Sequence, residues 1–158
     1  MPSGDYTYAN FDRDTAIGTG TTDTLLGAWR QGNLSAAHRL NWFAQGLWER
    51  ALASRAGYRP GDELDVAIGA YYEGQGTTSG IRISPLLQLV YSWRAHDGGS
   101  ESDPDNSGYT RALIAPGLEL RHGLWRAYAD VAIPLQQHVG GNQLVAPALY
   151  KLILSRAF

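Results

Sequence analysis

Charged side chains of both signs recur at alternate positions in several segments of the chain, between apolar neighbours. Charges buried without partners would cost more than a fold can offset, so these side chains must be paired or hydrated. On one face of a sheet they would either line a hydrated lumen and set its ion preference or form a structural ladder of salt bridges. The residues that we expect to line such a lumen are Glu49, Asp65, Glu73, Arg82, Arg94, Arg111, Glu119, Arg121, Arg126, Asp130 and Lys151.

Catalytic and metal-binding chemistry has little support in the sequence. Ser84, Ser92 and Ser155 would be candidate nucleophiles, but no Gly-x-Ser-x-Gly motif occurs. The acidic stretch 100–107 offers oxygen ligands for calcium but lacks the spacing and final glutamate of an EF-hand loop. The glycines of 18–20 lack the lysine of a phosphate-binding loop, and no histidine has a metal-ligand partner at close spacing. We therefore expect no enzyme, no metal site and no cofactor.

Two-residue periodicity indicates the elements that must hold the charges. Between residues 81 and 95, a row of Ile, Leu, Tyr and Trp side chains alternates with a row that contains Arg82 and Arg94. A helix would scatter both rows around its circumference, whereas a strand keeps each on one face. The same division recurs in four further segments, namely 63–73, 109–121, 124–135 and 148–158. These five segments predict antiparallel strands that pair with their neighbours in sequence.

The alternation is weaker in two earlier segments, 22–31 and 39–50. In the second of these, Leu40, Phe43 and Leu47 also fall at helical spacing. A helix therefore remains an alternative for residues 39–50, although a strand fits the rest of the pattern better.

The connections between the segments alternate in length. Counted back from the C-terminus, the joints 136–143, 97–108 and 54–62 are long, whereas 121–123 and 74–80 are shorter. In an outer-membrane barrel the long connections are extracellular and the short ones are periplasmic. The alternation supports an up-and-down meander independently of hydrophobicity.

Composition limits the class of protein. A formal net charge of −2 without any long basic run argues against a nucleic-acid partner. Cysteine is absent, and the first residues lack the basic and apolar regions of a secretory signal. No stretch reaches the roughly 18 apolar residues that a membrane-spanning helix needs. The mean hydropathy of −0.28 remains compatible with membrane-spanning strands, in which only alternate residues face lipid.

Trp and Tyr dominate the aromatic content, with five Trp and nine Tyr residues against three Phe. These amphipathic rings suit the interface between lipid and water. The aromatic residues that we expect to face the membrane are Trp42, Trp48, Tyr72, Tyr91, Trp93, Trp125 and Tyr150. The terminal Phe158, with apolar residues at alternate positions before it, looks like the signal that the outer-membrane assembly machinery reads.

Several short motifs occur together in a specific order. They are Gly18-Thr19-Gly20-Thr21-Thr22-Asp23, Leu25-Leu26-Gly27, Tyr58-Arg59-Pro60-Gly61, Ala115-Pro116-Gly117-Leu118, Ile133-Pro134-Leu135 and the terminal Phe158. Over nearly the whole chain this order resembles the C-terminal half of outer-membrane proteins of the phenol meta-pathway transporter family. The resemblance implies a partial barrel that lacks an N-terminal half, an eighth strand supplied by residues 4–13, or association of copies.

The chain departs from the pattern of that family on the expected lipid face. Arg30 and Arg156 stand where the family pattern leads us to expect aromatic residues. An arginine costs about 2–4 kcal/mol at the midplane of a membrane barrel but only about 0–1 kcal/mol near the interface. We therefore expect both arginines at the rims, Arg30 beside a turn at Gly32 and Arg156 beside the C-terminus.

Together these features predict an all-β fold, an antiparallel up-and-down transmembrane β-barrel of about seven to eight strands, complete or partial. Residues 21–158 would form the strands, and residues 1–20 the remnant of an extracellular loop or an extra strand. The expected function is a channel or transporter in the outer membrane of a Gram-negative bacterium, with passage of a small solute through a charged lumen. The expected partners are the lipid bilayer, the assembly machinery and that solute, whose identity is unknown. Two alternatives remain: a soluble β-barrel that binds an apolar ligand, and an outer-membrane barrel plugged by its own side chains.

Overall fold

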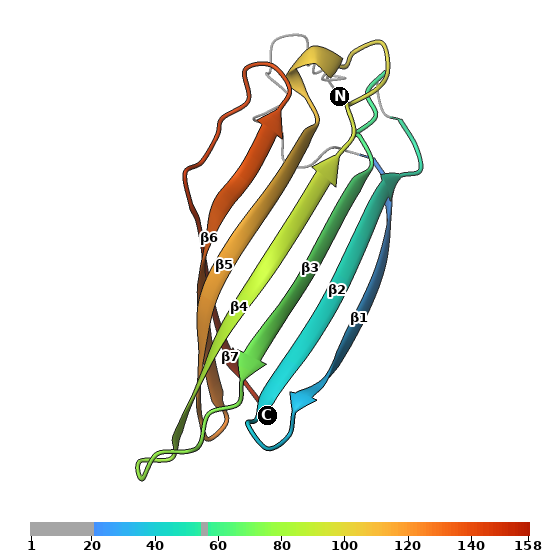
Figure 1. Ribbon diagram of the computed structural model, residues 1–158. Coiled ribbons are helices and arrows are strands. Elements are labelled where there is room, and N and C mark those ends of the chain that lie inside the picture. Colours follow the sequence, from blue (N-terminus) through green and yellow to red (C-terminus); the bar gives the residue numbers. More distant parts are fainter. Residues whose placement is uncertain (1–20, 55–56) are drawn as a thin grey trace, which may run out of the picture.

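The computed structural model describes residues 21–54 and 57–158, which form a single antiparallel sheet of seven strands. Each strand pairs with its neighbours in sequence, so the order in the sheet is the order in the chain (Figure 1). The strands are β1 (Asp23–Ser35), β2 (Leu40–Ala51), β3 (Glu63–Tyr72), β4 (Ile81–Arg94), β5 (Tyr109–His122), β6 (Trp125–Val139) and β7 (Leu149–Arg156). The prediction of an all-β up-and-down meander is confirmed, and the expected loop remnant or extra strand within residues 1–20 lies outside the described residues.

The segment with ambiguous periodicity, 39–50, belongs to a strand. β2 hydrogen-bonds to β1 on one side and to β3 on the other, so tertiary pairing decides against the helical alternative. The helical structure in the described ranges is a single 3-10 turn, η2 (Pro104–Asn106), in the connection between β4 and β5. No helix in this part of the chain is long and apolar enough to cross a membrane.

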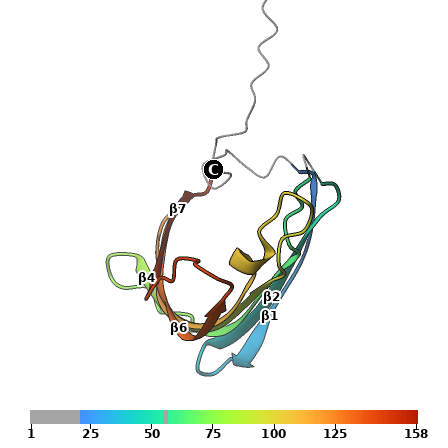
Figure 2. The same ribbon diagram turned by 90° about the horizontal axis from the view of Figure 1, so that it is seen from above.

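The sheet curves into an open trough. Seen from above, β1 and β7 lie at the two edges of the trough (Figure 2). No backbone pairing joins these two strands among the described residues. Because the seven strands alternate in direction, the two edge strands run in the same direction. The sheet is therefore not closed, as expected for part of a barrel.

The two faces of the sheet differ in composition, and the apolar face is the exposed one. On the outer, convex face of β4, Leu87 and Leu89 are each 50% exposed. On the inner, concave face of the same strand, Gln88 and Ser92 are only 7% and 2% exposed. No large side chain of the described residues is fully buried, so the sheet has no ordinary hydrophobic core. The buried apolar residues are Ala51, Ala67, Leu113, Ala115 and Ala132.

Strand β1 continues past the turn that was expected at Gly32. It runs to Ser35, and the turn is formed by residues 36–39. Gly32 makes room for a neighbour on β2, because a Cβ at this position would lie 2.7 Å from the indole Nε1 of Trp42. Arg30 therefore lies five residues inside the end of β1 rather than beside a turn, and that part of the prediction is wrong.

Long and short connections gather at opposite ends of the sheet (Figure 1), which confirms the predicted alternation. The end of the sheet with the long connections, 52–62, 95–108 and 140–148, is called the loop end. The opposite end, with the connections 36–39, 73–80 and 123–124, is called the turn end. Residues at the middle of a strand are thus held far from both sets of connections.

Asp97 ties two of the long connections together. Its carboxylate accepts hydrogen bonds from the hydroxyl of Tyr58 and the backbone N–H of Gly61, both at 2.8 Å, and pairs with the guanidinium of Arg94 at 3.0 Å. Its own backbone N–H donates to the hydroxyl of Ser107 at 2.9 Å. Burial, together with the bond to Asp97, raises the pKa of Tyr58 above its ordinary value. The β2–β3 and β4–β5 connections therefore act as one unit.

Replacing Asp97 with alanine should loosen the loop end. The lost carboxylate leaves a partly buried hydroxyl, an N–H and a guanidinium without their charged acceptor, which costs about 1–3 kcal/mol of unfolding free energy. Thermal unfolding and limited proteolysis at the loop end measure the effect. Asp103→Ala is the matched control, because the carboxylate of Asp103 accepts a local hydrogen bond from Asn106 in the same connection. An equal effect of both variants would contradict the role of Asp97.

Candidate functional site

The concave face carries a groove to which all seven strands contribute, with a volume of about 610 Å³. Side chains that line it include Trp29 on β1, Gln45 on β2, Asp65 on β3, Gln88 and Ser92 on β4, Arg111 on β5, Asp130 on β6 and Lys151 on β7. Four of the eleven charged residues predicted from the sequence are among them: Asp65, Arg111, Asp130 and Lys151. The other seven lie on the same face, nearer to its two ends.

Asp130 is the centre of a polar cluster in the groove. Its side chain is only 3% exposed. The carboxylate accepts hydrogen bonds from the hydroxyl of Tyr128 and, at 3.4 Å, from the amide of Gln88. The ammonium of Lys151, on the edge strand β7, lies 3.9 Å away. The cluster joins β4, β6 and β7 through one acceptor.

Small residues on β5 allow this cluster to form. Gln88 on β4 and Asp130 on β6 lie on opposite sides of β5, beside Ala115 and Gly117 respectively. A Cβ at Gly117 would lie 3.0 Å from the Cβ of Asp130 and 2.9 Å from the carbonyl oxygen of Ala129. The side chains from β4 and β6 can therefore meet across the intervening strand.

A second group of polar residues lies toward the loop end of the concave face. The hydroxyl of Tyr109 donates to the carboxylate of Glu63 at 2.6 Å, and the guanidinium of Arg111 lies 4.5 Å from the centre of the Tyr109 ring. The hydroxyl of Ser92 donates to Asp65 on the neighbouring strand. The two carboxylates in this group are thus held by neutral hydroxyl donors, and Arg111 contacts the tyrosine that binds one of them.

A third group, the turn-end belt, consists of Arg82, Arg121, Arg126, Glu73 and Glu119. The register aligns Arg82 with Arg121, and Arg121 with Arg126, so the three arginines lie side by side on β4, β5 and β6. Glu119 lies 3.2 Å from Arg121 and 3.6 Å from Arg126, and Glu73 lies 3.2 Å from Arg82. Three guanidiniums against two carboxylates leave one positive charge in excess. The arginine side chains are 43–50% exposed, so their pairing contributes little to stability.

Arg82, Arg111 and Arg126 share the polar face of three successive strands, a pattern that predicts one positive stretch, and this prediction is wrong for Arg111. Arg111 pairs with Ser92 and Gln137 and lies ten residues from Arg121 along β5, which corresponds to about 33 Å. Arg121 takes the place that was predicted for Arg111. Residues on the same face can lie at different heights, that is, at different positions between the loop end and the turn end. The register of each hairpin determines this height.

The predicted membrane-facing aromatic residues all lie on the convex face. Tyr72, Tyr91, Trp93, Trp125 and Tyr150 are exposed, whereas Trp42 and Trp48 are partly covered. Arg156 is on the same face at the turn end, where its guanidinium lies 5.5 Å from the centre of the Trp125 ring and 6.0 Å from that of Phe158. The exposed charge of Arg156 thus lies beside two aromatic rings at the edge of the apolar face.

Sequence reasoning missed several polar residues of the concave face. Tyr128 and Gln88 fall on the polar rows, but they carry no charge and were not selected as candidates. Glu63 lies at the first position of β3, beside Glu49 of β2, where the alternation has barely begun. An uncharged hydrogen-bonding residue in a polar row that also contains a carboxylate is the signal that could have found Tyr128 and Gln88.

By fold and site, the chain is an open meander sheet whose concave face is polar and whose convex face is apolar. Comparison with models of known families, with curated proteins and with solved structures found no match. The resemblance to the phenol meta-pathway transporter family therefore stays a prediction. The function is argued from geometry and chemistry.

Replacing Asp130 with alanine should destabilise the sheet more than the same change at Glu119. Loss of the buried carboxylate leaves Tyr128 and Gln88 without their shared acceptor, at a cost of about 1–3 kcal/mol. The exposed pairs of Glu119 are worth about 0–1 kcal/mol. Thermal or denaturant unfolding followed by circular dichroism measures both. Equal losses of unfolding free energy in the two variants would show that Asp130 contributes no more to stability than Glu119 does.

Proposed function

We propose that the chain forms part of the wall of a β-barrel in a bacterial outer membrane, and that the concave face lines a hydrated passage for small solutes. The observation that carries the proposal is the distribution of side chains over the two faces. Apolar and aromatic residues occupy the convex face, and charged residues in pairs and clusters occupy the concave one. In a membrane barrel lipid covers the outward apolar row, while water fills or borders the lumen.

The same distribution argues against a soluble barrel that binds an apolar ligand. Such a barrel would place Leu, Ile and Trp inward and its charges outward. Here Ile68, Leu87, Leu89 and Leu152 are between 50% and 79% exposed on the convex face. A continuous apolar surface of this kind would make a protein in water associate or precipitate. Lipid is the environment in which that surface is favourable.

A barrel in lipid cannot leave edge strands unpaired, because exposed backbone groups find no water there. Both β1 and β7 must therefore pair with further strands in the proposed state. Since β1 and β7 run in the same direction, antiparallel closure needs an odd number of added strands, which makes the total even, as in bacterial barrels. Segments outside the described residues, or a second polypeptide, would supply them.

The groups along the concave face suit selectivity rather than tight binding. Exposed arginines of the turn-end belt keep one positive charge in excess, and charges that line a narrow wet passage act on ions more strongly than charges in bulk water. The terminal Phe158, fully exposed beyond β7, is proposed as the element that the assembly machinery reads.

The membrane assignment predicts that a new arginine reduces folding on the convex face but not on the concave face. Leu89 lies near the middle of β4 on the convex face, and Gln45 lies on the concave face of β2 and is exposed. Leu89→Arg should reduce folding into phosphatidylcholine vesicles, because a lipid-facing arginine at this depth costs about 2–4 kcal/mol. Gln45→Arg, the control, should fold as the wild type does. Normal folding of Leu89→Arg in water without detergent would contradict the assignment.

A channel role predicts a change in ion preference when the turn-end belt is neutralised. Replacing Arg82, Arg121 and Arg126 with glutamine converts an excess of one positive charge into two unpaired carboxylates, Glu73 and Glu119. Reversal potentials in planar bilayers should shift toward cation preference, with little change in thermal stability because these pairs are exposed.

The control for this experiment is Arg30→Gln, which removes an arginine from the convex face and should leave ion preference unchanged. Unaltered preference in the triple variant, together with a large loss of stability, would contradict the channel and favour a plugged barrel.

A further inference from the structure

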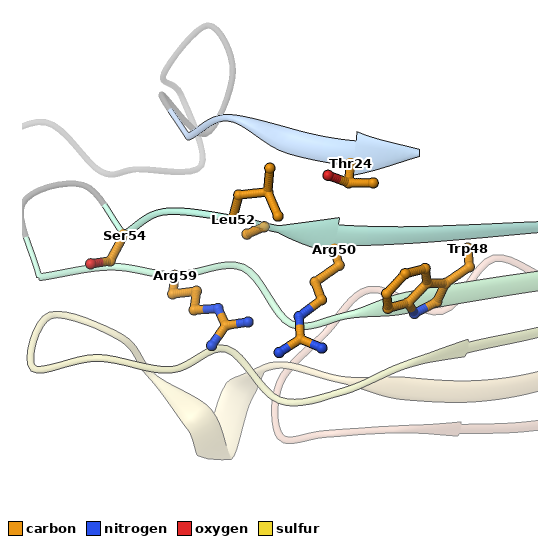
Figure 3. A pocket seen from close by; sticks show the side chains of 7 residues that line it. Thr24, Trp48, Arg50, Leu52, Ser54 and Arg59 are labelled. Carbon is orange, nitrogen blue, oxygen red and sulfur yellow. The ribbon is translucent and has the colours of Figure 1, made fainter. Parts of the chain in front are cut away.

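A second pocket, the rim pocket, lies outside the groove, at the loop end of the sheet (Figure 3). Its volume is about 610 Å³. It is lined by Trp48 and Arg50 of β2, by Leu52, Ser54 and Arg59 from the connection that follows, and by Thr24 of β1. The function proposed for the concave face does not use any of these side chains.

Local structure places two arginines together in this pocket. Alternation along β2 puts Trp48 and Arg50 on the convex face, with Arg50 next to the end of the strand. Arg59 is held by a pair of backbone hydrogen bonds to Gly98, both 2.8 Å long. In Figure 3 the side chains of Arg50 and Arg59 extend to the same side of the chain, and Arg50 lies between Arg59 and Trp48.

The charges in the rim pocket are not balanced. Arg50 Nε lies 3.8 Å from one carboxylate oxygen of Asp62, and Arg59 Nη2 lies 3.8 Å from the other. Two guanidiniums thus share one carboxylate, which leaves one positive charge in excess. Both contacts are too long for strong hydrogen bonds, and the two arginine side chains are 48% and 42% exposed. Their N–H groups are therefore accessible to an anion.

We propose that the rim pocket binds the phosphate group of an anionic lipid headgroup. Planar guanidinium groups match the oxygens of a phosphate and bind them with charge-assisted hydrogen bonds. The hydroxyls of Thr24 and Ser54 line the same pocket and can also donate to phosphate oxygens. The proposal rests on the membrane orientation proposed above, in which the convex face contacts lipid.

Apolar neighbours favour a lipid over a free phosphate ion. Trp48 lies in the pocket, and Leu52 at its border is 66% exposed. A Trp ring with one apolar and one polar part is typical of the depth at which headgroups meet hydrocarbon. A ligand that carries a phosphate and an apolar tail would contact both the polar and the apolar side chains of the pocket, whereas an inorganic ion would contact only the polar ones.

Lipid binding to the full chain in detergent micelles tests the proposal. Native mass spectrometry would count bound phosphatidic acid, with phosphatidylcholine and inorganic phosphate as comparison probes. We expect a preference for phosphatidic acid that falls roughly tenfold or more when Arg50 and Arg59 are both replaced by glutamine, because charge-assisted hydrogen bonds are lost. Asp62→Asn should act in the opposite direction and tighten binding, since it removes the competing carboxylate.

Arg30→Gln, which removes a convex-face arginine outside the pocket, is the matched control and should retain wild-type binding. Unchanged binding in the double variant, or inorganic phosphate that competes as well as the lipid does, would overturn the proposal. Insertion into phosphatidylcholine vesicles is measured separately and tests the proposed function. A chain that inserts without any preference for phosphatidic acid disproves the rim pocket alone, and a chain that binds this lipid without inserting disproves the channel alone.

Discussion

Because no large side chain of residues 21–54 and 57–158 is fully buried, the sheet depends on the backbone hydrogen bonds between neighbouring strands. Six antiparallel pairings, each between strands adjacent in sequence, hold the described residues together. These pairings satisfy the backbone N–H and C=O groups, which must find partners wherever water is excluded. They also determine on which face, and at which height, each side chain lies. The polar groove and the apolar convex face both follow from this one set of pairings.

The concave face illustrates how such a sheet can hold charges without a hydrophobic core. Small residues on the central strands, such as Ala115 and Gly117, leave room for longer polar side chains from the strands on either side. Asp130 then gains hydrogen-bond donors from β4 and β6 and an ammonium 3.9 Å away on β7, which together compensate for the loss of water around a carboxylate. The arginines of the turn-end belt differ from Asp130, because they remain exposed and retain part of their hydration. In the proposed channel, stability and selectivity would thus depend on different positions of the same face.

Periodicity predicted much of this arrangement because a strand fixes the face of each residue with a period of two. The rows on β4, β5 and β6 therefore fell on the correct faces, and the lengths of the connections gave the meander. Periodicity does not fix height. Arg111 and Arg121 share a face of β5, yet only Arg121 aligns with Arg82, because the register of the β4–β5 hairpin decides which residues meet.

Other features depend on contacts that one-dimensional patterns do not contain. The turn after β1 was misplaced because Gly32, a residue typical of turns, is needed here for the approach of the Trp42 ring. Asp97 lies in a connection without periodicity, so its bonds to Tyr58 and Gly61 had no signal in the sequence. The rim pocket likewise had no signal in the sequence. It brings Arg50 of β2 together with Arg59, nine positions further along the chain, in the connection that follows.

In the passage proposed above, the order of charges along the concave face would act on any solute that moves through it. Toward the loop end, the concave face carries Glu49, Glu63 and Asp65 together with Arg94 and Arg111, so carboxylates outnumber guanidiniums there. At the turn end the balance reverses, because the turn-end belt carries an excess of guanidinium groups. A passage with opposite charge at its two ends favours solutes that can exchange partners along the way, such as zwitterions or polar neutral molecules, over ions of a single sign. Its field also has a direction, so charged residues at the two ends would affect entry and exit of the same solute in opposite ways.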